Sequence, residues 1–176
     1  IFFKSNGKSK EENIAVSKLP IIKLGMDYKS EEGLGLHRQI GISFKNDNSF
    51  GFDKGYDAAM LDVGETDFYW KFPNNDDKYA ITGVQAISDD LEVPLYLSLA
   101  HNGTVTIGID EWEAIDKKVY IKDKLTNQAY LISEGRFSLT LSSGSYTDRF
   151  FLAFQEVKSN TLDVEDDLVL FGKKIA

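Results

Sequence analysis

The chain contains no cysteine among its 176 residues. This absence excludes disulfide bonds, thiolate zinc sites and cysteine nucleophiles. Histidine is also scarce, because His37 and His101 are the two in the chain, and no HxH or HExxH spacing supports a histidine metal site. A GxSxG nucleophile elbow is lacking, so no local signature supports a serine hydrolase triad.

Long apolar runs and an excess of positive charge are lacking as well. No run approaches the roughly 20 residues of a membrane-spanning helix. With 20 Lys and Arg against 28 Asp and Glu, the net charge is −8, which argues against nucleic acid as a partner. The 42% of hydrophobic residues is too high for an intrinsically disordered chain and suffices for the core of one domain.

Apolar residues recur with a period of two along most of the chain, which is typical of half-buried strands. The runs that show this period are residues 21–26, 38–44, 68–72, 79–87, 93–99, 104–109, 119–122, 129–132, 137–141 and 150–154. Helical periodicity is not sustained anywhere, although residues 109–115 are compatible with one helical turn. About ten short strands separated by turn signals predict an all-β fold, a β-sandwich or jelly roll of antiparallel strands.

Turn residues predict three hairpins. Asn102-Gly103 is the strongest signal, because both central residues of a type I′ turn need positive φ. The other two expected hairpin turns are residues 123–128 and 142–145. Pro94 has no N–H group, so its strand is expected to be an edge strand or to carry a bulge at that point.

The two ends of the chain do not follow the strand pattern. We interpret residues 1–19 as a linker or N-terminal arm, residues 20–157 as the β-domain, and residues 158–176 as a linker with the truncated start of a further segment. The chain opens with Ile1 and not with Met, which indicates a processed or excised fragment from which any targeting peptide has been removed.

Aspartates are concentrated in residues 51–62, where Asp53, Asp57 and Asp62 are candidate calcium ligands. Calcium takes roughly six to eight oxygen ligands from carboxylates and loop carbonyls, and a loop of this composition could supply them. The spacing is not that of an EF-hand. The alternative is that these aspartates cap turns and accept hydrogen bonds from backbone N–H groups.

Aromatic side chains are candidates for binding carbohydrate, since a flat ring can stack on the apolar face of a pyranose. Tyr69, Tyr96 and Trp112 are the candidates. Tyr96 lies opposite the apolar stripe of its strand, so its pattern gives the strongest expectation of an exposed ring, followed by that of Tyr69. Trp70 shares a face with two phenylalanines and is expected in the core.

Several acidic residues are candidates for chemistry by residue type alone. Asp110, Glu111 and Glu113 could supply the two facing carboxylates of a glycosidase, but a solvated acidic loop is the favoured alternative. No catalytic residue is therefore assigned. For the Asp148-Arg149 pair we favour a structural role, in which Asp148 accepts hydrogen bonds from loop N–H groups and Arg149 pairs with a carboxylate on a neighbouring strand.

Short motifs in a fixed order cover roughly residues 36–155. They are Arg38-Gln39-Ile40-Gly41, Gly55-Tyr56-Asp57, Asp67-Phe68-Tyr69-Trp70, Tyr79-Ala80-Ile81-Thr82-Gly83-Val84, Leu91-Glu92-Val93-Pro94-Leu95, Val119-Tyr120-Ile121-Lys122-Asp123 and Gly144-Ser145-Tyr146-Thr147-Asp148-Arg149-Phe150. This series resembles the domain that precedes the C-terminal sorting domain in many large secreted proteins of Bacteroidetes, especially marine flavobacteria. Those proteins look like clients of the type IX secretion system. The tail from Leu162 is similar to the start of a type IX sorting domain but lacks most of it.

The resemblance implies an extracellular or cell-surface β-domain of a larger, adhesin-like protein. Its expected partners are the type IX secretion machinery and the other domains of the parent protein. Because the resemblance carries no catalytic residue set, the expected function is non-enzymatic: the domain links its parent to export and surface anchoring. The alternatives are a carbohydrate-binding module for a polysaccharide or glycan, with structural calcium, and an accessory domain of a polysaccharide-degrading hydrolase.

Overall fold

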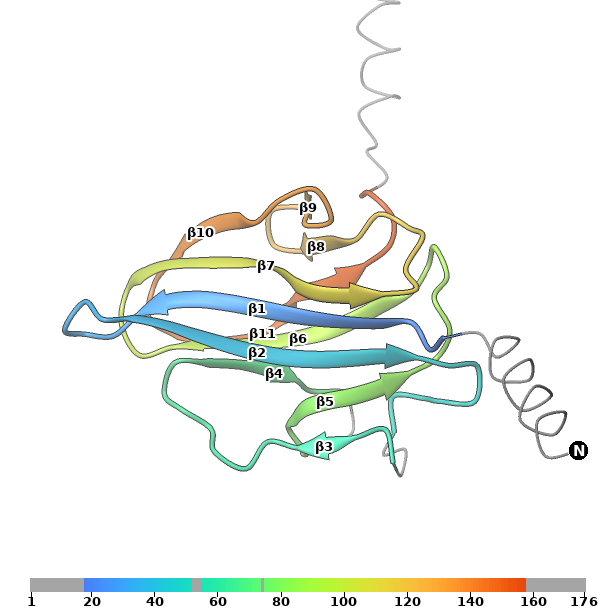
Figure 1. The fold of residues 1–176 in the computed structure, drawn as a ribbon. Coiled ribbons are helices and arrows are strands. Elements are labelled where there is room, and N and C mark those ends of the chain that lie inside the picture. Colours follow the sequence, from blue (N-terminus) through green and yellow to red (C-terminus); the bar gives the residue numbers. More distant parts are fainter. Residues whose placement is uncertain (1–17, 52–54, 74, 158–176) are drawn as a thin grey trace, which may run out of the picture.

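The computed structural model describes residues 18–51, 55–73 and 75–157 (Figure 1). Within these ranges the chain forms eleven strands and no helix, so no described helix could span a membrane. The strands are β1 (Ile21–Lys29), β2 (Gly35–Phe44), β3 (Ala58–Ala59), β4 (Asp67–Trp70), β5 (Tyr79–Val84), β6 (Glu92–Leu99), β7 (Gly103–Glu113), β8 (Tyr120–Asp123), β9 (Gln128–Leu131), β10 (Phe137–Leu141) and β11 (Gly144–Ala153). The prediction of an all-β fold is confirmed.

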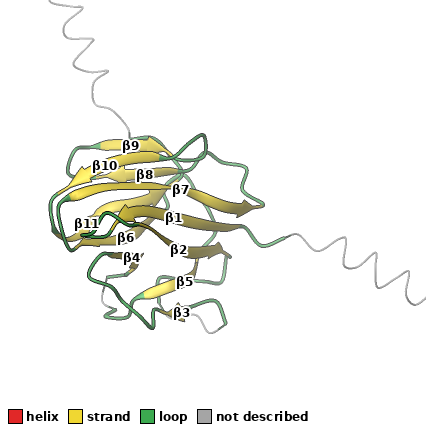
Figure 2. Ribbon diagram, turned by 60° about the vertical axis from the view of Figure 1, so that its left-hand side comes forward, coloured by secondary structure: helices red, strands yellow, loops and turns green. Residues whose placement is uncertain are grey.

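The strands form one hydrogen-bonded sheet in the order β10-β7-β1-β2-β5-β4-β6-β11-β8-β9, with β3 paired to β5. All pairs are antiparallel except β2 with β5. The sheet curls until its two end strands, β9 and β10, lie side by side, as both ribbon views show (Figures 1 and 2). Tyr130 of β9 stacks on Phe137 of β10 with 4.5 Å between the ring centroids. The sheet is therefore nearly closed into a barrel.

The core consists of the alternate residues that the period of two assigns to one face of each strand. Ile40, Ile42 and Phe44 of β2 are buried, as predicted, and Trp70 is fully buried. The indole Nε1 of Trp70 donates a 2.9 Å hydrogen bond to the carbonyl of Gly41, which satisfies its polar atom. Burial of these side chains is the main stabilising term of the fold.

Of the three predicted hairpins, the one at residues 123–128 is confirmed, since β8 pairs with β9. The prediction of a hairpin at Asn102-Gly103 is wrong, because β6 pairs with β4 and β11, whereas β7 pairs with β1 and β10. The prediction of a hairpin at residues 142–145 is wrong for the same reason, as β10 pairs with β7 whereas β11 pairs with β6 and β8. Both connections cross the curled sheet, and the Asn102 side chain accepts a 2.8 Å hydrogen bond from the Ser143 N–H and joins them.

Two further local expectations are wrong. Residues 109–115 form no helical turn, because β7 continues as a strand to Glu113 along its ladder with β1. Pro94 does not lie on an edge strand, since β6 has β4 on one side and β11 on the other, and its pairing with Phe151 shows no bulge at Pro94 itself. The β4 ladder ends at Leu95, however, so the missing N–H of Pro94 leaves that ladder intact.

The expected linker segments, apart from Lys18 and Leu19, lie outside the described residues.

Candidate functional site

The structure brings two of the three candidate sugar-binding aromatics together. Tyr69 of β4 and Tyr96 of β6 are cross-strand partners whose rings stack with centroids 4.5 Å apart and planes at 13°. The expectation that Tyr69 is exposed is wrong, because its strand lies between β5 and β6 and the side chain is 2% exposed. Burial, with the Tyr96 hydroxyl as a second cause, raises the pKa of Tyr69 well above its usual range. Tyr96 is partly exposed, as predicted.

Trp112, the third candidate, lies near the end of β7 and is 45% exposed. Four strands of the sheet order separate β7 from β6. Trp112 thus forms no common aromatic surface with Tyr69 and Tyr96.

A hollow of about 340 Å³ opens beside Tyr96. Pro94 and Tyr96 of β6, Lys71 after β4, Asn75, and the Thr147-Asp148 segment of β11 are among its lining residues. These groups come from three regions of the sequence and meet because β6 lies between β4 and β11.

A bulge in β11 shapes this hollow. Tyr146 pairs with Leu97 and Phe150 with Leu95, so three residues of β11 lie opposite the single residue Tyr96. Asp148, in the middle of the bulge, has a φ of 55°, the left-handed conformation that few residues other than glycine adopt. Bulges of this kind re-aim side chains and are common beside functional sites.

Arg149 is the last residue of the bulge and binds it to β8. Its Nε and NH2 groups donate hydrogen bonds of 2.9 Å to the two carboxylate oxygens of Asp123 on β8. The ion pair expected for Arg149 is confirmed, whereas the role expected for Asp148 is not, because no described N–H group donates to its carboxylate. Burial by itself would raise the pKa of the Asp123 carboxyl, but Arg149 and the N–H of Leu125 outweigh it and hold that pKa below its ordinary value.

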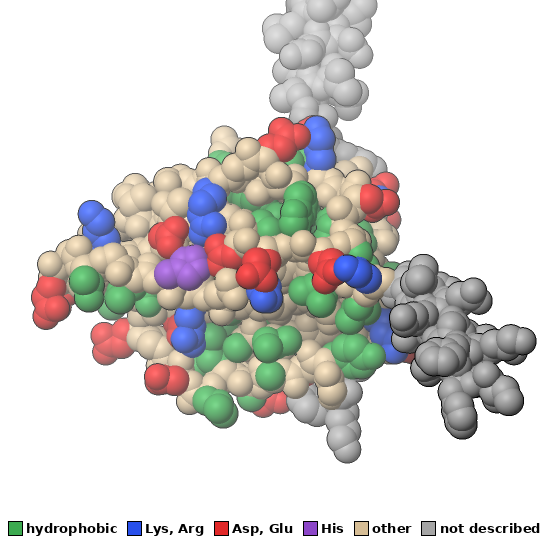
Figure 3. All heavy atoms as spheres, in the orientation of Figure 1, with side chains coloured by type: hydrophobic (Ala, Val, Ile, Leu, Met, Phe, Trp, Pro, Cys, Tyr) green, Lys and Arg blue, Asp and Glu red, His purple; other side chains and the backbone are tan. Residues whose placement is uncertain are grey.

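A second polar cluster, the His37 cluster, lies on the outer face of β1, β2 and β7. His37 Nδ1 is 2.6 Å from Asp27 Oδ1, and its Nε2 is 2.7 Å from Asp110 Oδ2. Gln39 and Arg136 donate hydrogen bonds of 2.8 and 2.9 Å to the Asp110 carboxylate. Figure 3 shows acidic, basic and histidine side chains gathered on one face of the molecule.

Asp110 reaches this cluster because it is the extra residue of a bulge in β7. Leu24 pairs with Ile109 and Lys23 with Glu111, so Asp110 has no partner of its own on β1. The carboxylate lies against Gly25, where an added Cβ would be 2.3 Å from Asp110 Oδ2. Burial alone would raise the pKa of Asp110, but its hydrogen bonds to Gln39, Arg136 and His37 lower it.

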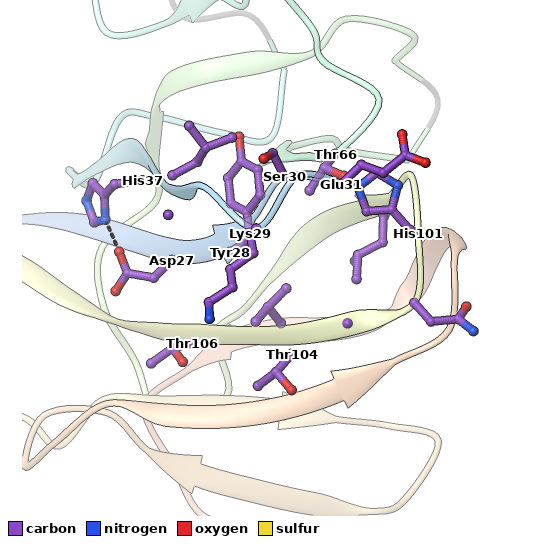
Figure 4. Close-up of a pocket in the computed structure, with 17 residues that line it drawn as sticks. Asp27, Tyr28, Lys29, Ser30, Glu31, His37, Thr66, His101, Thr104 and Thr106 are labelled. Atoms are coloured by element: carbon purple, nitrogen blue, oxygen red, sulfur yellow. Dashed lines mark hydrogen bonds and ion pairs between the residues drawn. The ribbon is translucent and has the colours of Figure 1, made fainter.

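A groove of about 930 Å³ borders the His37 cluster (Figure 4). The β1–β2 turn and the start of β7 line it, with Tyr28, Lys29, Thr104 and Thr106 among its residues. His37 lies at one end of the view and His101 at the other, so the groove does not bring the two histidines together as metal ligands.

The calcium candidates have other partners or lie outside the described residues. The Asp57 carboxylate accepts a 2.7 Å hydrogen bond from the Gly83 N–H and a 3.0 Å bond from the Thr82 hydroxyl, as the capping alternative predicted. The Asp62 carbonyl accepts a 2.8 Å bond from Arg38. Asp53 lies outside the described residues. Across the described ranges, no three Asp, Glu or His side chains form a group that could hold a metal ion.

The glycosidase candidates form ion pairs across neighbouring segments. Glu111 pairs with Lys23 at 2.6 Å, and Glu113 pairs with Lys18 at 2.7 Å. Sequence reasoning missed the bulges that place Asp110 and Asp148. The signal available was weak: His37 and Gln39 share one face of a strand, and Asp148 interrupts the alternation just before Phe150.

A family described as a domain of unknown function, DUF8693, matches residues 2–154. No curated protein and no solved structure matches the chain. Since the match covers far more than half of the sequence, the chain belongs to the DUF8693 family.

Proposed function

We propose that the chain is a non-enzymatic β-domain of a larger secreted or cell-surface protein and that it links its parent to export by the type IX machinery. The proposal rests on the motif resemblance, and ion pairs between different strands support it further. Asp123 pairs with Arg149, Asp67 with Arg38 at 2.9 Å, and Glu92 with two lysines. Charges paired in this way hold strands together.

The protonation of the acidic groups fits a structural role. A glycosidase acid needs a carboxyl whose pKa is raised, so that it holds a proton at neutral pH. Among the described residues, the carboxyl groups with a clear shift are Glu92, Asp110 and Asp123, and the pKa of each is lowered. For Glu92, burial opposes this change and Lys122 and Lys124 outweigh it. Because their pKa values are lowered, these carboxyl groups stay ionised and are suited to pair with Lys and Arg side chains.

The ends of the described domain suit a linking role. Lys18 precedes β1 and is exposed, with 75% of its side chain accessible, and Glu156 after β11 is also exposed. The two ends lie at separate places on the surface (Figure 1). A domain inserted between others needs both of its ends accessible.

We further infer that the two halves of the curled sheet form the layers of a sandwich of jelly-roll type. The β6–β7 and β10–β11 connections both cross from one side of the sheet to the other, and such crossing connections are typical of Greek-key sandwiches. The two halves would then pack as layers around the common core, which includes residues of β2 and β6.

The test follows the parent protein in its own bacterium, with an antibody against this domain. We expect the antigen at the outer surface or in the medium, and we expect it to remain inside cells whose type IX machinery is disabled. Export that is unchanged in those cells would overturn the secretion route. The purified chain is also incubated with a panel of polysaccharides, and release of reducing sugar would overturn the non-enzymatic assignment.

A further inference from the structure

The hollow beside Tyr96 is lined in part by charged side chains that have no partner in the described residues. Asp110 and Asp123, by contrast, are engaged by arginines. Around the hollow, Lys71, Asp76 and Asp148 make no hydrogen bond or ion pair with another described residue. These three groups carry charge of both signs and remain available to a ligand.

The aromatic wall of the hollow is held in a fixed position. The Tyr96 ring stacks on Tyr69, and the Lys78 ammonium lies 5.4 Å from the centroid of the Tyr69 ring. Pro94, two residues before Tyr96 on the same strand face, adds a rigid apolar surface beside the ring. A ring packed in this way loses little conformational entropy when a ligand contacts it.

The β11 bulge is also held in place. The bidentate Arg149–Asp123 pair fixes one end of the bulge, so Thr147 and Asp148 protrude beside Tyr96 and are exposed. The left-handed backbone of Asp148 costs free energy that a glycine at this position would not cost. An aspartate here supplies a carboxylate at the rim that glycine cannot supply.

We propose that this hollow binds a neutral pyranose unit of a glycan, a function that goes beyond the linking role. A pyranose has an apolar C–H face and a rim of hydroxyl groups. Tyr96 and Pro94 match the face, while the Asp148 carboxylate accepts hydrogen bonds from the hydroxyls and Lys71 and Asn75 donate to them. Mixed charge around the hollow disfavours a strongly anionic ligand.

The volume limits the size of the bound unit. About 340 Å³ lies at the small end of the roughly 300–1,000 Å³ found for ligand pockets. We therefore infer that the hollow takes a chain end or a single internal unit, with the remaining glycan in solvent. Binding at one unit of this kind is weak, and the repeated units of a polysaccharide raise the apparent affinity only by the number of equivalent units.

The experiment uses the purified chain in affinity gels that contain a neutral β-glucan, galactan, mannan or xylan, followed by calorimetry with the tetrasaccharide of any retaining polymer. We expect retention by at least one polymer. Asp148→Gly should weaken binding at least tenfold while it leaves the melting temperature unchanged or higher, because glycine relaxes the positive φ. Tyr96→Ala should abolish retention, and Tyr96→Phe, which keeps the ring, should preserve most of it.

The matched control is Tyr130→Ala, which also removes a half-buried tyrosine from a stacked pair with a 4.5 Å separation. It should leave retention at the wild-type level. Absence of retention on every polymer would overturn the proposal. Wild-type affinity in Asp148→Gly would also overturn the proposal. Loss of retention in Trp112→Ala, with retention by Tyr96→Ala unaffected, would overturn it too, since that pattern places the sugar at Trp112.

Discussion

Arg149 in the β11 bulge binds Asp123 at the end of β8 through two parallel hydrogen bonds of 2.9 Å. The Asp123 side chain has no exposed surface, and that of Arg149 is 17% exposed. A bidentate pair with this geometry defines the position of both strands. It also connects the confirmed β8–β9 hairpin to the bulge beside Tyr96, so one ion pair supports both the sheet and the proposed sugar site.

Replacing Arg149 by Leu should destabilise the fold by about 3–5 kcal/mol, because it leaves the Asp123 carboxylate buried without its cation. Urea unfolding followed by circular dichroism measures the change. The control is Lys23→Met, which breaks the exposed pair with Glu111 and should cost about 0–1 kcal/mol. Equal losses in the two variants would contradict the assignment.

The His37 cluster should make stability depend on pH near neutrality. Hydrogen bonds to Asp27 and then Asp110 raise the pKa of His37 above its ordinary value of 6.5. The histidine therefore stabilises the fold below pH 6.5, and this contribution is lost as the pH rises through the folded-state pKa. The effect should be modest, since 43% of the side chain is exposed.

Thermal melts between about pH 5.5 and 8.5 test the His37 prediction. The decrease in melting temperature with rising pH should be smaller in His37→Gln than in the wild type. The control is His101→Gln at the other end of the groove, which should behave as the wild type does. Identical pH profiles in the wild type and His37→Gln would refute the role of the cluster.

Gly25 should not tolerate a side chain, because a Cβ at this position would lie 2.3 Å from the Asp110 carboxylate. We expect Gly25→Ala to destabilise the fold by about 1–3 kcal/mol as Asp110 is displaced from its partners. Gly35→Ala is the control, since nothing lies within 4 Å of its added Cβ. If Gly25→Ala costs the same in an Asp110→Ala background, steric conflict with Asp110 is not the cause.

The calcium hypothesis for Asp53, Asp57 and Asp62 makes a separate prediction. A bound ion at a hundredfold excess over its Kd stabilises the fold by about 2.7 kcal/mol, so EDTA should lower the melting temperature. The matched variant Asp53→Asn should lose this response, whereas Asp89→Asn should keep it. A melt that EDTA leaves unchanged would reject calcium as a stabilising ion.

The candidate sites could be predicted only in part. The alternation along residues 93–99 correctly identified Tyr96 as an outward-facing ring. The same reasoning failed for Tyr69, because exposure depends on the strands and side chains that cover it. The Asp148 backbone and the Asp110 bulge had no clear signal, since a bulge is defined by its partner strand.

The sequence by itself determined which face of a strand such as β2 enters the core. Alternation of the type seen at Ile40, Ile42 and Phe44 is a local property, because successive side chains of a strand point to opposite faces. The tertiary structure decided which strands pair. Asn102-Gly103 has the residues of a tight hairpin turn, yet β6 and β7 separate across the curled sheet. The apolar faces of β6 and β7 are both buried in one core when each strand pairs with other strands. The free energy gained by this burial exceeds the preference of Asn102-Gly103 for a tight hairpin turn.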